Sequence, residues 1–291
     1  MRKLVLVSLT ILLFCCAAPR NLQAQQPQPT PQPLTFYYDY RVNPGKEEEF
    51  MKLVQTVGAP VRDKLLADGV IQAWGIETPI LRYPAGTTHL IWFSVANYDG
   101  VEKVLSAMEA QLAKLAADEA KAADAPRAKR QQPAMTTAER TREVFDMSKT
   151  RDWLTRDLVS NYGPPPAAGS LPFTRYNFVK AKVGKGAAYR AAWEKYNKPV
   201  YDKLVADGVI LAYGMAAEDV KTDGDFTHFI WFGTANLAGI EKVGQAIGAD
   251  RRRRSEEERT AIADLFTSLT EPDMARSIIT RSRIFKVAGM K

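Results

Sequence analysis

Apolar and polar positions recur along this chain with two periods, and the two periods follow one another in the same order twice. Residues 34–42 are rich in aromatic and β-branched side chains, which is typical of a β-strand. Residues 46–68 carry apolar side chains every three to four positions, which predicts an amphipathic helix: Phe50, Leu53, Val54, Val57, Val61 and Leu65. Residues 70–77 and 88–95 are typical of two further strands.

Proline and glycine interrupt these patterns at corresponding places. Pro60 and Pro199 are expected to kink or re-cap the first helix of each set, because proline lacks an amide hydrogen. Gly69 and Gly208, each preceded by aspartate, are expected to end that helix, because glycine readily takes the left-handed conformation of a helix terminus.

Polar residues predict where the later helices begin. Asn97 and Asn236 are expected to cap a second helix, because their side chains can accept hydrogen bonds from its free amides. In the first set an Ala- and charge-rich helix follows, and Thr137 is a candidate cap for another short helix. Residues 154–163 and 276–287 are each predicted to form a fourth strand.

The order of elements reflects an internal repeat. Residues 36–105 align with residues 175–244 without a gap, and 26 of the 70 positions are identical. Because the match holds across strand, helix and loop, it indicates two copies of one unit. Each copy is predicted to have the order β-α-β-β-α-(α)-β, a ferredoxin-like arrangement.

The third strand of each copy is apolar on both faces, so both faces of the sheet need cover. Helices can cover one face, and the sheet of the other copy is expected to pack on the other face and close a barrel. The predicted fold is therefore α+β: two tandem ferredoxin-like units with antiparallel sheets form an intramolecular dimeric α/β barrel. The units span residues 34–162 and 172–291, with a Pro/Gly-rich linker at 163–171.

The first residues indicate export. Arg2 and Lys3 precede an apolar run at residues 4–18, which predicts a secretory signal at residues 1–24. Cleavage near Ala17 and an uncleaved anchor are the alternatives. Residues 25–33 are rich in proline and glutamine and are predicted to be an extended spacer. The protein is expected in the periplasm or outside the cell.

The two cysteines, Cys15 and Cys16, both lie in the signal segment. The residues before them are Phe14 and Cys15, where lipidation requires a small residue, so a lipoprotein is the less favoured alternative. The mature chain has no cysteine, which excludes a disulfide, a thiolate nucleophile and a cysteine metal site.

The net charge of the chain bears mainly on whether the protein binds nucleic acid. Removing the signal takes away three of 40 basic residues, which leaves 37 against 33 acidic ones and a net charge of about +4. This charge is too small to favour nucleic acid as a partner. After cleavage no membrane association is expected.

The two histidines of the chain, His89 and His228, occupy corresponding positions at the start of the third strand. Histidine titrates near neutral pH and can act as a base or a ligand. The alternative is a packed imidazole bound to a backbone carbonyl or a neighbouring threonine. With one histidine per copy, neither a metal site nor a cofactor is predicted.

Further candidates for a ligand pocket lie on the predicted strands: Tyr37, Tyr176, Trp74, Tyr213, Trp92, Trp231, Asp39 and Arg41. Large aromatics on strands are commonly core, but they can also line a flat apolar pocket. Asp39 is expected to pair with Arg41, two residues along on the same face, because a buried carboxylate is costly without a partner. No residue can be assigned a catalytic role.

These residues resemble the dimeric α/β-barrel superfamily. The resemblance is closest to the stress-responsive A/B-barrel type, in which a Thr-His pair opens the third strand; here the pairs are Thr88-His89 and Thr227-His228. Members include cofactor-independent monooxygenases, cyclases, haem-binding enzymes and proteins without known activity. The cyclase-like members carry a further histidine after the second helix, which this chain lacks, so the resemblance does not imply cyclase chemistry.

The sequence therefore favours an exported protein that binds a small apolar or aromatic ligand in its barrel. A cofactor-independent monooxygenase-like enzyme and a haem-handling protein are the alternatives. Because a tandem chain can complete its own barrel, a monomer or a loose homodimer is expected.

Overall fold

The computed structural model describes residues 32–81, 86–123, 135–164, 171–222 and 225–289. The predicted signal at residues 1–24 lies outside this part of the chain. So do most of the spacer at 25–33 and most of the linker at 163–171.

The first half, residues 34–162, and the second half, residues 172–287, have the same order of strands. The first contains β1 (Leu34–Tyr40), α1 (Glu47–Leu53), the π-helix η1 (Val54–Gly58), α2 (Ala59–Ala67), β2 (Ile71–Pro79), β3 (His89–Val95), α3 (Tyr98–Ala123), α4 (Thr137–Val144), η3 (Met147–Lys149) and β4 (Arg151–Tyr162). The second contains β5 (Phe173–Val179), α5 (Gly186–Tyr196), α6 (Lys198–Ala206), β6 (Ala212–Val220), β7 (His228–Thr234), α7 (Leu237–Arg252), α8 (Glu256–Leu269), η4 (Pro272–Met274) and β8 (Arg276–Val287).

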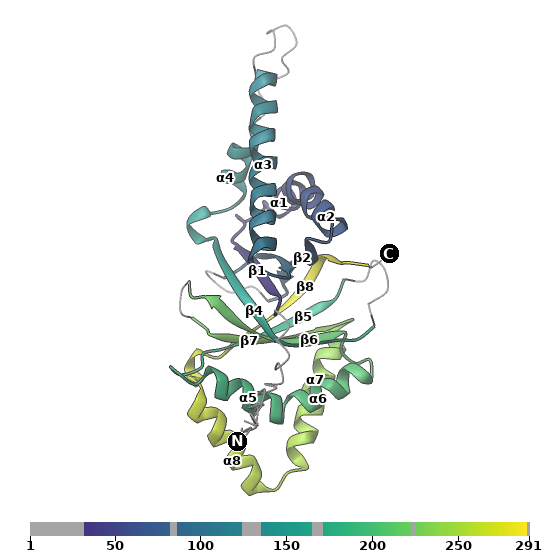
Figure 1. Ribbon diagram of the computed structural model, residues 1–291, viewed down its shortest axis with the longest axis vertical. Coiled ribbons are helices and arrows are strands. Elements are labelled where there is room, and N and C mark those ends of the chain that lie inside the picture. Colours follow the sequence, from purple (N-terminus) through teal and green to yellow (C-terminus); the bar gives the residue numbers. More distant parts are fainter. Residues whose placement is uncertain (1–31, 82–85, 124–134, 165–170, 223–224, 290–291) are drawn as a thin grey trace, which may run out of the picture. The chain divides into compact units, whose positions relative to one another are not determined.

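These eight strands form one closed antiparallel barrel in the order β1-β3-β2-β8-β5-β7-β6-β4 (Figure 1). The expected barrel is confirmed, but the halves join through hydrogen-bonded strand edges as well as through packed faces. The reason is the length of β4 and β8, which have 12 residues each. The first part of β4 pairs with β1 and its later part with β6, and β8 does the same with β5 and β2.

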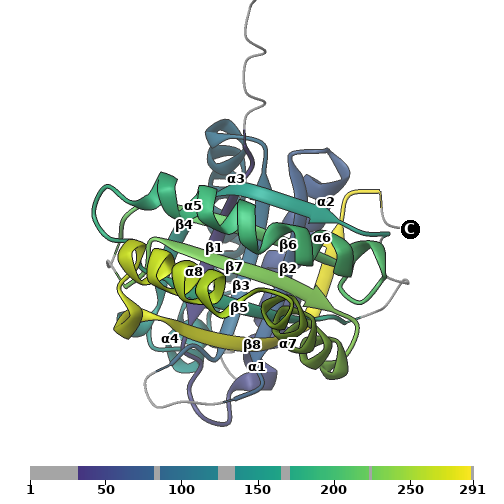
Figure 2. The same ribbon diagram turned by 90° about the horizontal axis from the view of Figure 1, so that it is seen from below.

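Helices cover the outside of the barrel on both halves. In the first half, α2 and α3 contact β1, β2 and β3, and α4 packs on α1. Figure 2 looks onto the second half, where α5 and α6 form one row across the strands and α7 and α8 form another. One apolar core lies under each helix layer, and a third, largely aromatic, fills the barrel.

Most of the expected helix ends are confirmed. Pro60 lies in the first turn of α2, directly after η1, and Gly69 follows the helix with φ +73°. The Asn97 and Asn236 side chains accept hydrogen bonds from the amides of Gly100 and Gly239.

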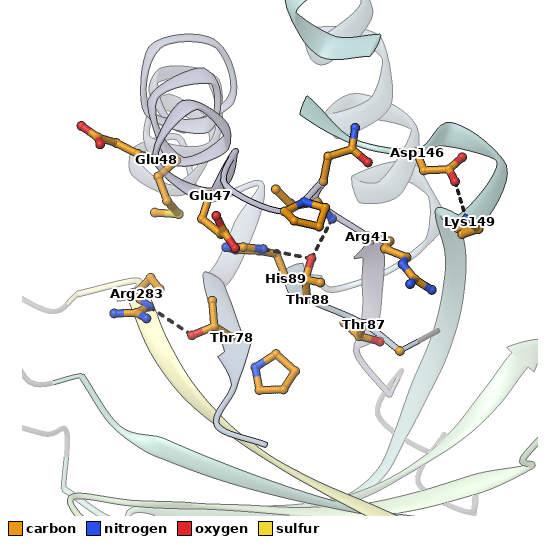
Figure 3. Close-up of a pocket in the computed structure, with 16 residues that line it drawn as sticks. Arg41, Glu47, Glu48, Thr78, Thr87, Thr88, His89, Asp146, Lys149 and Arg283 are labelled. Carbon is orange, nitrogen blue, oxygen red and sulfur yellow. Dashed lines mark hydrogen bonds and ion pairs between the residues drawn. The ribbon is translucent and has the colours of Figure 1, made fainter. Parts of the chain in front are cut away.

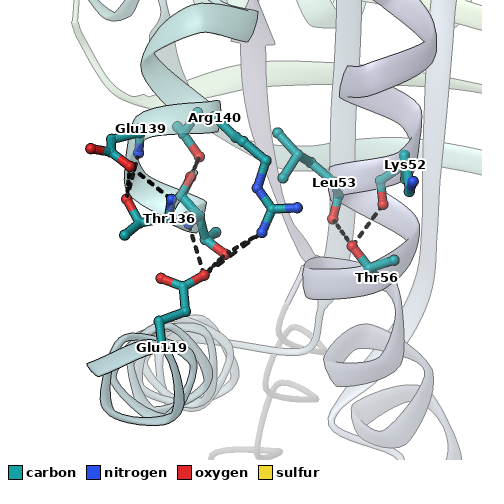
Figure 4. Close-up of polar contacts among 9 residues, drawn as sticks. Lys52, Leu53, Thr56, Glu119, Thr136, Glu139 and Arg140 are labelled. Carbon is teal, nitrogen blue, oxygen red and sulfur yellow. Dashed lines mark hydrogen bonds and ion pairs between the residues drawn. The ribbon is translucent and has the colours of Figure 1, made fainter. Parts of the chain in front are cut away.

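The expected cap at Thr137 is wrong. The cap is Thr136, whose extended backbone precedes the helix and whose hydroxyl accepts from the Glu139 amide at 3.2 Å. Figure 4 shows this capping box. Thr137 is already helical, and its hydroxyl donates to Glu119 of α3 at 2.7 Å.

Candidate functional site

The strand alternation divides the ten predicted site residues between two layers. Tyr37, Tyr176, Asp39, Trp92 and Trp231 face the barrel interior. His89, His228, Trp74 and Tyr213 face the helix layers. Arg41 follows β1 and lines a cavity at the end of the first half. The structure therefore does not bring the ten residues together in one pocket.

His89 is held between β3 and α1. Its ring lies 4.5 Å from the ring of Phe50, centroid to centroid. The Thr88 hydroxyl donates to the Tyr40 carbonyl at 3.0 Å and accepts from the Val42 amide at 2.7 Å. Because that hydroxyl has one hydrogen, the His89 Nδ1 that lies 3.2 Å away must be the donor. Thr88 thus holds Nδ1 of His89 as a hydrogen-bond donor.

His228 repeats this arrangement with Thr227, at 2.9 Å, but its surroundings are apolar. Burial lowers its pKa to about 4, so the ring is neutral at physiological pH. Gly186 packs against it, where the first half has Glu47. Figure 3 shows Glu47 pointing toward His89. The two histidines are therefore chemically different.

Trp74 and Tyr213 belong to the outer cores. Trp74 donates to the Asp63 carboxylate at 3.1 Å, and Tyr213 donates to Asp202 at 2.6 Å. Both rings are fully buried. These contacts give the repeated aspartates of α2 and α6 a structural role.

Asp39 does not pair with Arg41 as expected. It binds Arg151, whose Nε lies 3.2 Å from Oδ2, because Arg151 stands directly across from it on β4. Burial raises the pKa of Asp39, and the Thr87 and Arg151 contacts oppose this shift. The cross-strand neighbour is closer than the next residue along the same strand face.

Glu77 is a buried carboxylate that the sequence reasoning missed. It accepts from Trp92 Nε1 at 3.1 Å, the Tyr176 hydroxyl at 3.1 Å and Thr174 at 3.4 Å, and also from Thr280. Burial raises its pKa, and these four donors counteract the shift. The available signal was one glutamate at the end of an otherwise apolar strand.

Asp157 is a second missed carboxyl group in the barrel interior. It faces Ala216 across the β4–β6 pair, and it accepts a hydrogen bond from the Thr35 hydroxyl at 3.5 Å. Burial raises its pKa to about 7, and the Thr35 contact opposes the shift only weakly. Asp157 therefore changes protonation near neutral pH.

A polar cavity of about 840 Å³ opens at the end of the first half, between α1, β1, β2 and the start of β3 (Figure 3). We call it the first-half cavity. Its lining includes His89, Thr88, Glu47, Glu48, Thr78, Thr87, Asn43, Arg41, Asp146, Lys149 and Arg283. Two of the ten predicted residues, His89 and Arg41, belong to this set.

A groove of about 680 Å³ lies between the helices and the sheet of the second half. We call it the second-half groove. Its walls are apolar and aromatic: Trp193, Tyr196, Val200, Tyr201, Ile230, Phe232, Ile240, Val243, Ile247, Ile262 and Phe266. Its polar lining includes Arg175, Asn177, Asp250, Arg251, Arg254 and Arg259. None of the ten predicted residues lines this groove in the described structure.

Three substitutions between the halves explain why this groove is found in the second half. The positions of Phe36, Tyr38 and Leu105 correspond to Arg175, Asn177 and Gly244. In the first half the three large side chains pack against the core and fill this space. At Gly244 an added Cβ would meet nothing within 4 Å, so the groove is open beside it.

Among the described residues, histidine and carboxylate side chains do not gather in a group of three or more that could hold a metal ion. Among the described helices, none is both long and apolar enough to cross a membrane.

No protein-family model and no curated protein matches the sequence significantly. Solved structures do. A "putative monooxygenase" from Fusobacterium nucleatum matches with a TM-score of 0.57 and 9% identity, over 89% of this chain and 96% of that one. A "putative monooxygenase" from Lactobacillus acidophilus matches with a TM-score of 0.55 and 8% identity, over 89% and 98%.

An anthrone oxidase-like protein shares 9% identity at a TM-score of 0.48 over 89% of this chain and 94% of that one. The first two likenesses are close enough to establish the fold, and at this identity they establish the fold alone. The chain has the fold of the dimeric α/β-barrel superfamily.

Proposed function

We propose that the protein binds a small, flat aromatic acid in the second-half groove. The observation that carries this proposal is the combination of an aromatic wall with a guanidinium that has neutral partners. Arg175 Nε donates to Asn177 at 3.0 Å, and its NH2 group donates to Ser277 at 3.4 Å. In the described structure Arg175 has no carboxylate partner. An anionic group on the ligand can supply one.

The size and lining of the groove suit such a ligand. Small-molecule sites commonly have volumes of about 300–1,000 Å³ and apolar walls with a few polar groups, and this groove falls in that range. Tyr196 and Phe266 are half-buried at the groove and offer rings for stacking. Burial raises the pKa of Tyr201 to about 12, so its hydroxyl stays protonated and can donate a hydrogen bond.

Binding is favoured over catalysis because no histidine is among the described residues that line the groove. His228 packs beneath Gly186 and is not among the lining residues, so it does not suit an axial haem ligand in this groove. An oxygenase reaction is a second candidate, motivated by the names of the structural neighbours.

The test uses two naphthalene probes of similar shape, 1-naphthoate and the neutral 1-naphthalenemethanol, in calorimetric titrations of the mature protein. Gly244→Leu places in the groove the side chain that fills the first half, and it should weaken both probes at least tenfold. Leucine also favours the helix more than glycine, so folding should not suffer. Gln245→Leu, an exposed change on the same helix, should leave both affinities unchanged.

Arg175→Met separates charge from shape. It should weaken 1-naphthoate at least tenfold and change the neutral alcohol less than threefold. Equal binding by wild type and Gly244→Leu would contradict the proposal. Oxygen uptake with an added aromatic diol, and a Soret band on adding haem, would point instead to the oxygenase or the haem-handling alternative.

We also propose that the two halves are copies of one ferredoxin-like unit and that the protein is exported. The 26 identities in 70 aligned positions and the shared strand order support the first proposal. The basic start and apolar run of residues 1–24 support the second. The intact mass of protein recovered from the periplasm would identify the cleavage site, and a full-length mass would contradict removal of the signal.

A further inference from the structure

The first-half cavity has a volume of about 840 Å³, against about 680 Å³ for the second-half groove, and its lining differs from that of the groove. Most of its lining side chains are charged or carry a hydroxyl group: the basic residues Arg41, Lys149 and Arg283, the acidic residues Glu47, Glu48 and Asp146, and Thr78, Thr87 and Thr88. Which of the charged side chains in the first-half cavity have partners within the chain indicates which ligand the cavity can bind.

The corresponding basic residue of the second half is neutralised. Lys180, at the position of Arg41, lies 3.5 Å from the Glu271 carboxylate. The Glu271 amide also donates to the Lys180 carbonyl at 2.8 Å, which holds the two segments together. Lys180 therefore carries its counter-charge within the chain.

In the first half the corresponding carboxylate, that of Asp146, pairs with another residue and not with Arg41. Asp146 occupies the place of Glu271, and its amide donates to the Arg41 carbonyl at 3.2 Å. Its carboxylate instead contacts Lys149 at 2.8 Å and Ser148 Oγ at 2.6 Å. The Lys149 and Ser148 contacts lower the pKa of Asp146 to about 2, so it stays ionised and engaged.

Arg41 is consequently left with its charge toward the cavity. It is half-buried, and in the described structure its side chain makes no ion pair or hydrogen bond. Arg283, on the opposite side of the cavity in Figure 3, donates to the neutral Thr78 hydroxyl at 3.1 Å. Thr78 and Thr87 add hydroxyl groups to the lining.

We propose that the first-half cavity binds a small polar carboxylic acid, such as a hydroxy acid, with its carboxylate on Arg41. The planar guanidinium suits a bidentate carboxylate. The hydroxyls of Thr78 and Thr87 suit the oxygens of a polar body. This site is separate from the second-half groove and does not depend on it.

The experiment is a ligand-observed NMR titration of the mature protein with lactate, malate and citrate. At least one should bind the wild type, and Gly244→Leu should bind it equally, because the groove takes no part. Arg41→Met should weaken it at least tenfold, and Arg41→Lys should lose less. Lys180→Met is the matched control and should change nothing.

Three results would overturn the proposal. They are no binding of any of the three acids to the wild type at about 20 mM, equal binding by Arg41→Met, or an equal loss with Lys180→Met. A tenfold loss is what removal of one charge-assisted contact of roughly 1.4 kcal/mol produces. Thermal unfolding of each variant checks that the fold is kept.

Discussion

At the scale of single residues, two of the carboxyl groups in the barrel interior lie at corresponding junctions but on opposite strands. Glu77 of β2 faces Ser282 of β8, whereas Asp157 of β4 faces Ala216 of β6. The longer glutamate reaches four donors, and the shorter aspartate has Thr35 at 3.5 Å. The side chain that is longer by one methylene therefore has four donors, and the shorter one has a single weak contact.

Asp157→Asn should remove part of the pH dependence of stability. The pKa of Asp157 is about 7 in the folded protein and about 3.9 when unfolded, so its protonated form stabilises the fold below about pH 4. This contribution is lost as the pH rises toward 7. Urea unfolding should show wild-type stability falling relative to the variant by roughly 3 kcal/mol between pH 4.5 and 7.5.

His228 acts with the opposite sign, because its lowered pKa makes stability fall as the pH drops from about 6.5 to 4. It is present in both proteins and cancels in the comparison. Asp99→Asn, an exposed change, is the control. Parallel profiles for wild type and Asp157→Asn would refute the assignment.

Arg62→Met should stabilise the protein. Arg62 is 4% exposed, its Nε has no hydrogen-bond partner, and its charge faces the rings of Tyr38 and Trp74 at 6.0 and 5.8 Å. Burial lowers its pKa, which reflects the cost of the charge. A methionine of similar length should raise the unfolding free energy by roughly 1–3 kcal/mol. Lys52→Met is the surface control, and a lower melting temperature in Arg62→Met would show that the guanidinium is needed.

At the scale of elements, helix ends are determined locally. The Ser255 hydroxyl accepts from the Glu258 amide at 3.1 Å, and the Glu258 carboxylate accepts from the Ser255 amide at 3.1 Å. The same box closes the start of α4 at Thr136 and Glu139. Both boxes are short-range and independent of the barrel.

Ser255→Ala and Thr136→Ala should each destabilise the protein by about 1 kcal/mol, because each leaves a helical amide without its partner. Amide exchange should quicken in the first turn of α8 or α4, and the other helix should be unaffected. Ser268→Ala, at the exposed end of α8, should change stability by less than about 0.5 kcal/mol. A spread of the effect into the barrel strands would contradict a local role.

At the scale of the whole molecule, each half lacks the strand partners that close its sheet. β2 and β4 are the outer strands of the first half, and β6 and β8 are those of the second. In the intact chain Glu77 lies at the β2–β8 junction and Asp157 at the β4–β6 junction, where Glu218 also lies opposite Thr155. Separate halves would change this distribution, because each would have to pair with a copy of itself.

Separately expressed halves should therefore differ in self-association. A dimer of residues 34–162 would set Glu77 opposite Asp157 at both junctions, and two adjacent carboxylates repel one another. A dimer of residues 172–289 would set Ala216 opposite Ser282. Analytical ultracentrifugation should find a stable dimer of the second half, and a weak one of the first that strengthens as the pH falls below 7. Asp157→Ser should strengthen the first-half dimer, and equal association of both halves would refute the argument.

The periodicity of apolar residues and the internal repeat were sufficient to predict the strands, the main helices and the closed barrel. The local signals are the strand and helix periods and the residues Gly69, Pro60 and Asn97. Each of them acts over a few neighbouring residues, so its effect can be predicted from the sequence. The direction in which each strand residue points, and which edge it meets, depends on pairing between residues far apart. Only the tertiary structure therefore shows that His89 faces the helix layer whereas Trp92 faces the barrel interior. It also shows that Asp39 pairs with Arg151 and not with Arg41. It also shows that Glu77 and Asp157 lie in the barrel interior where strands of the two halves meet. The second-half groove likewise depends on the tertiary structure, because it opens where large side chains of the first half are replaced.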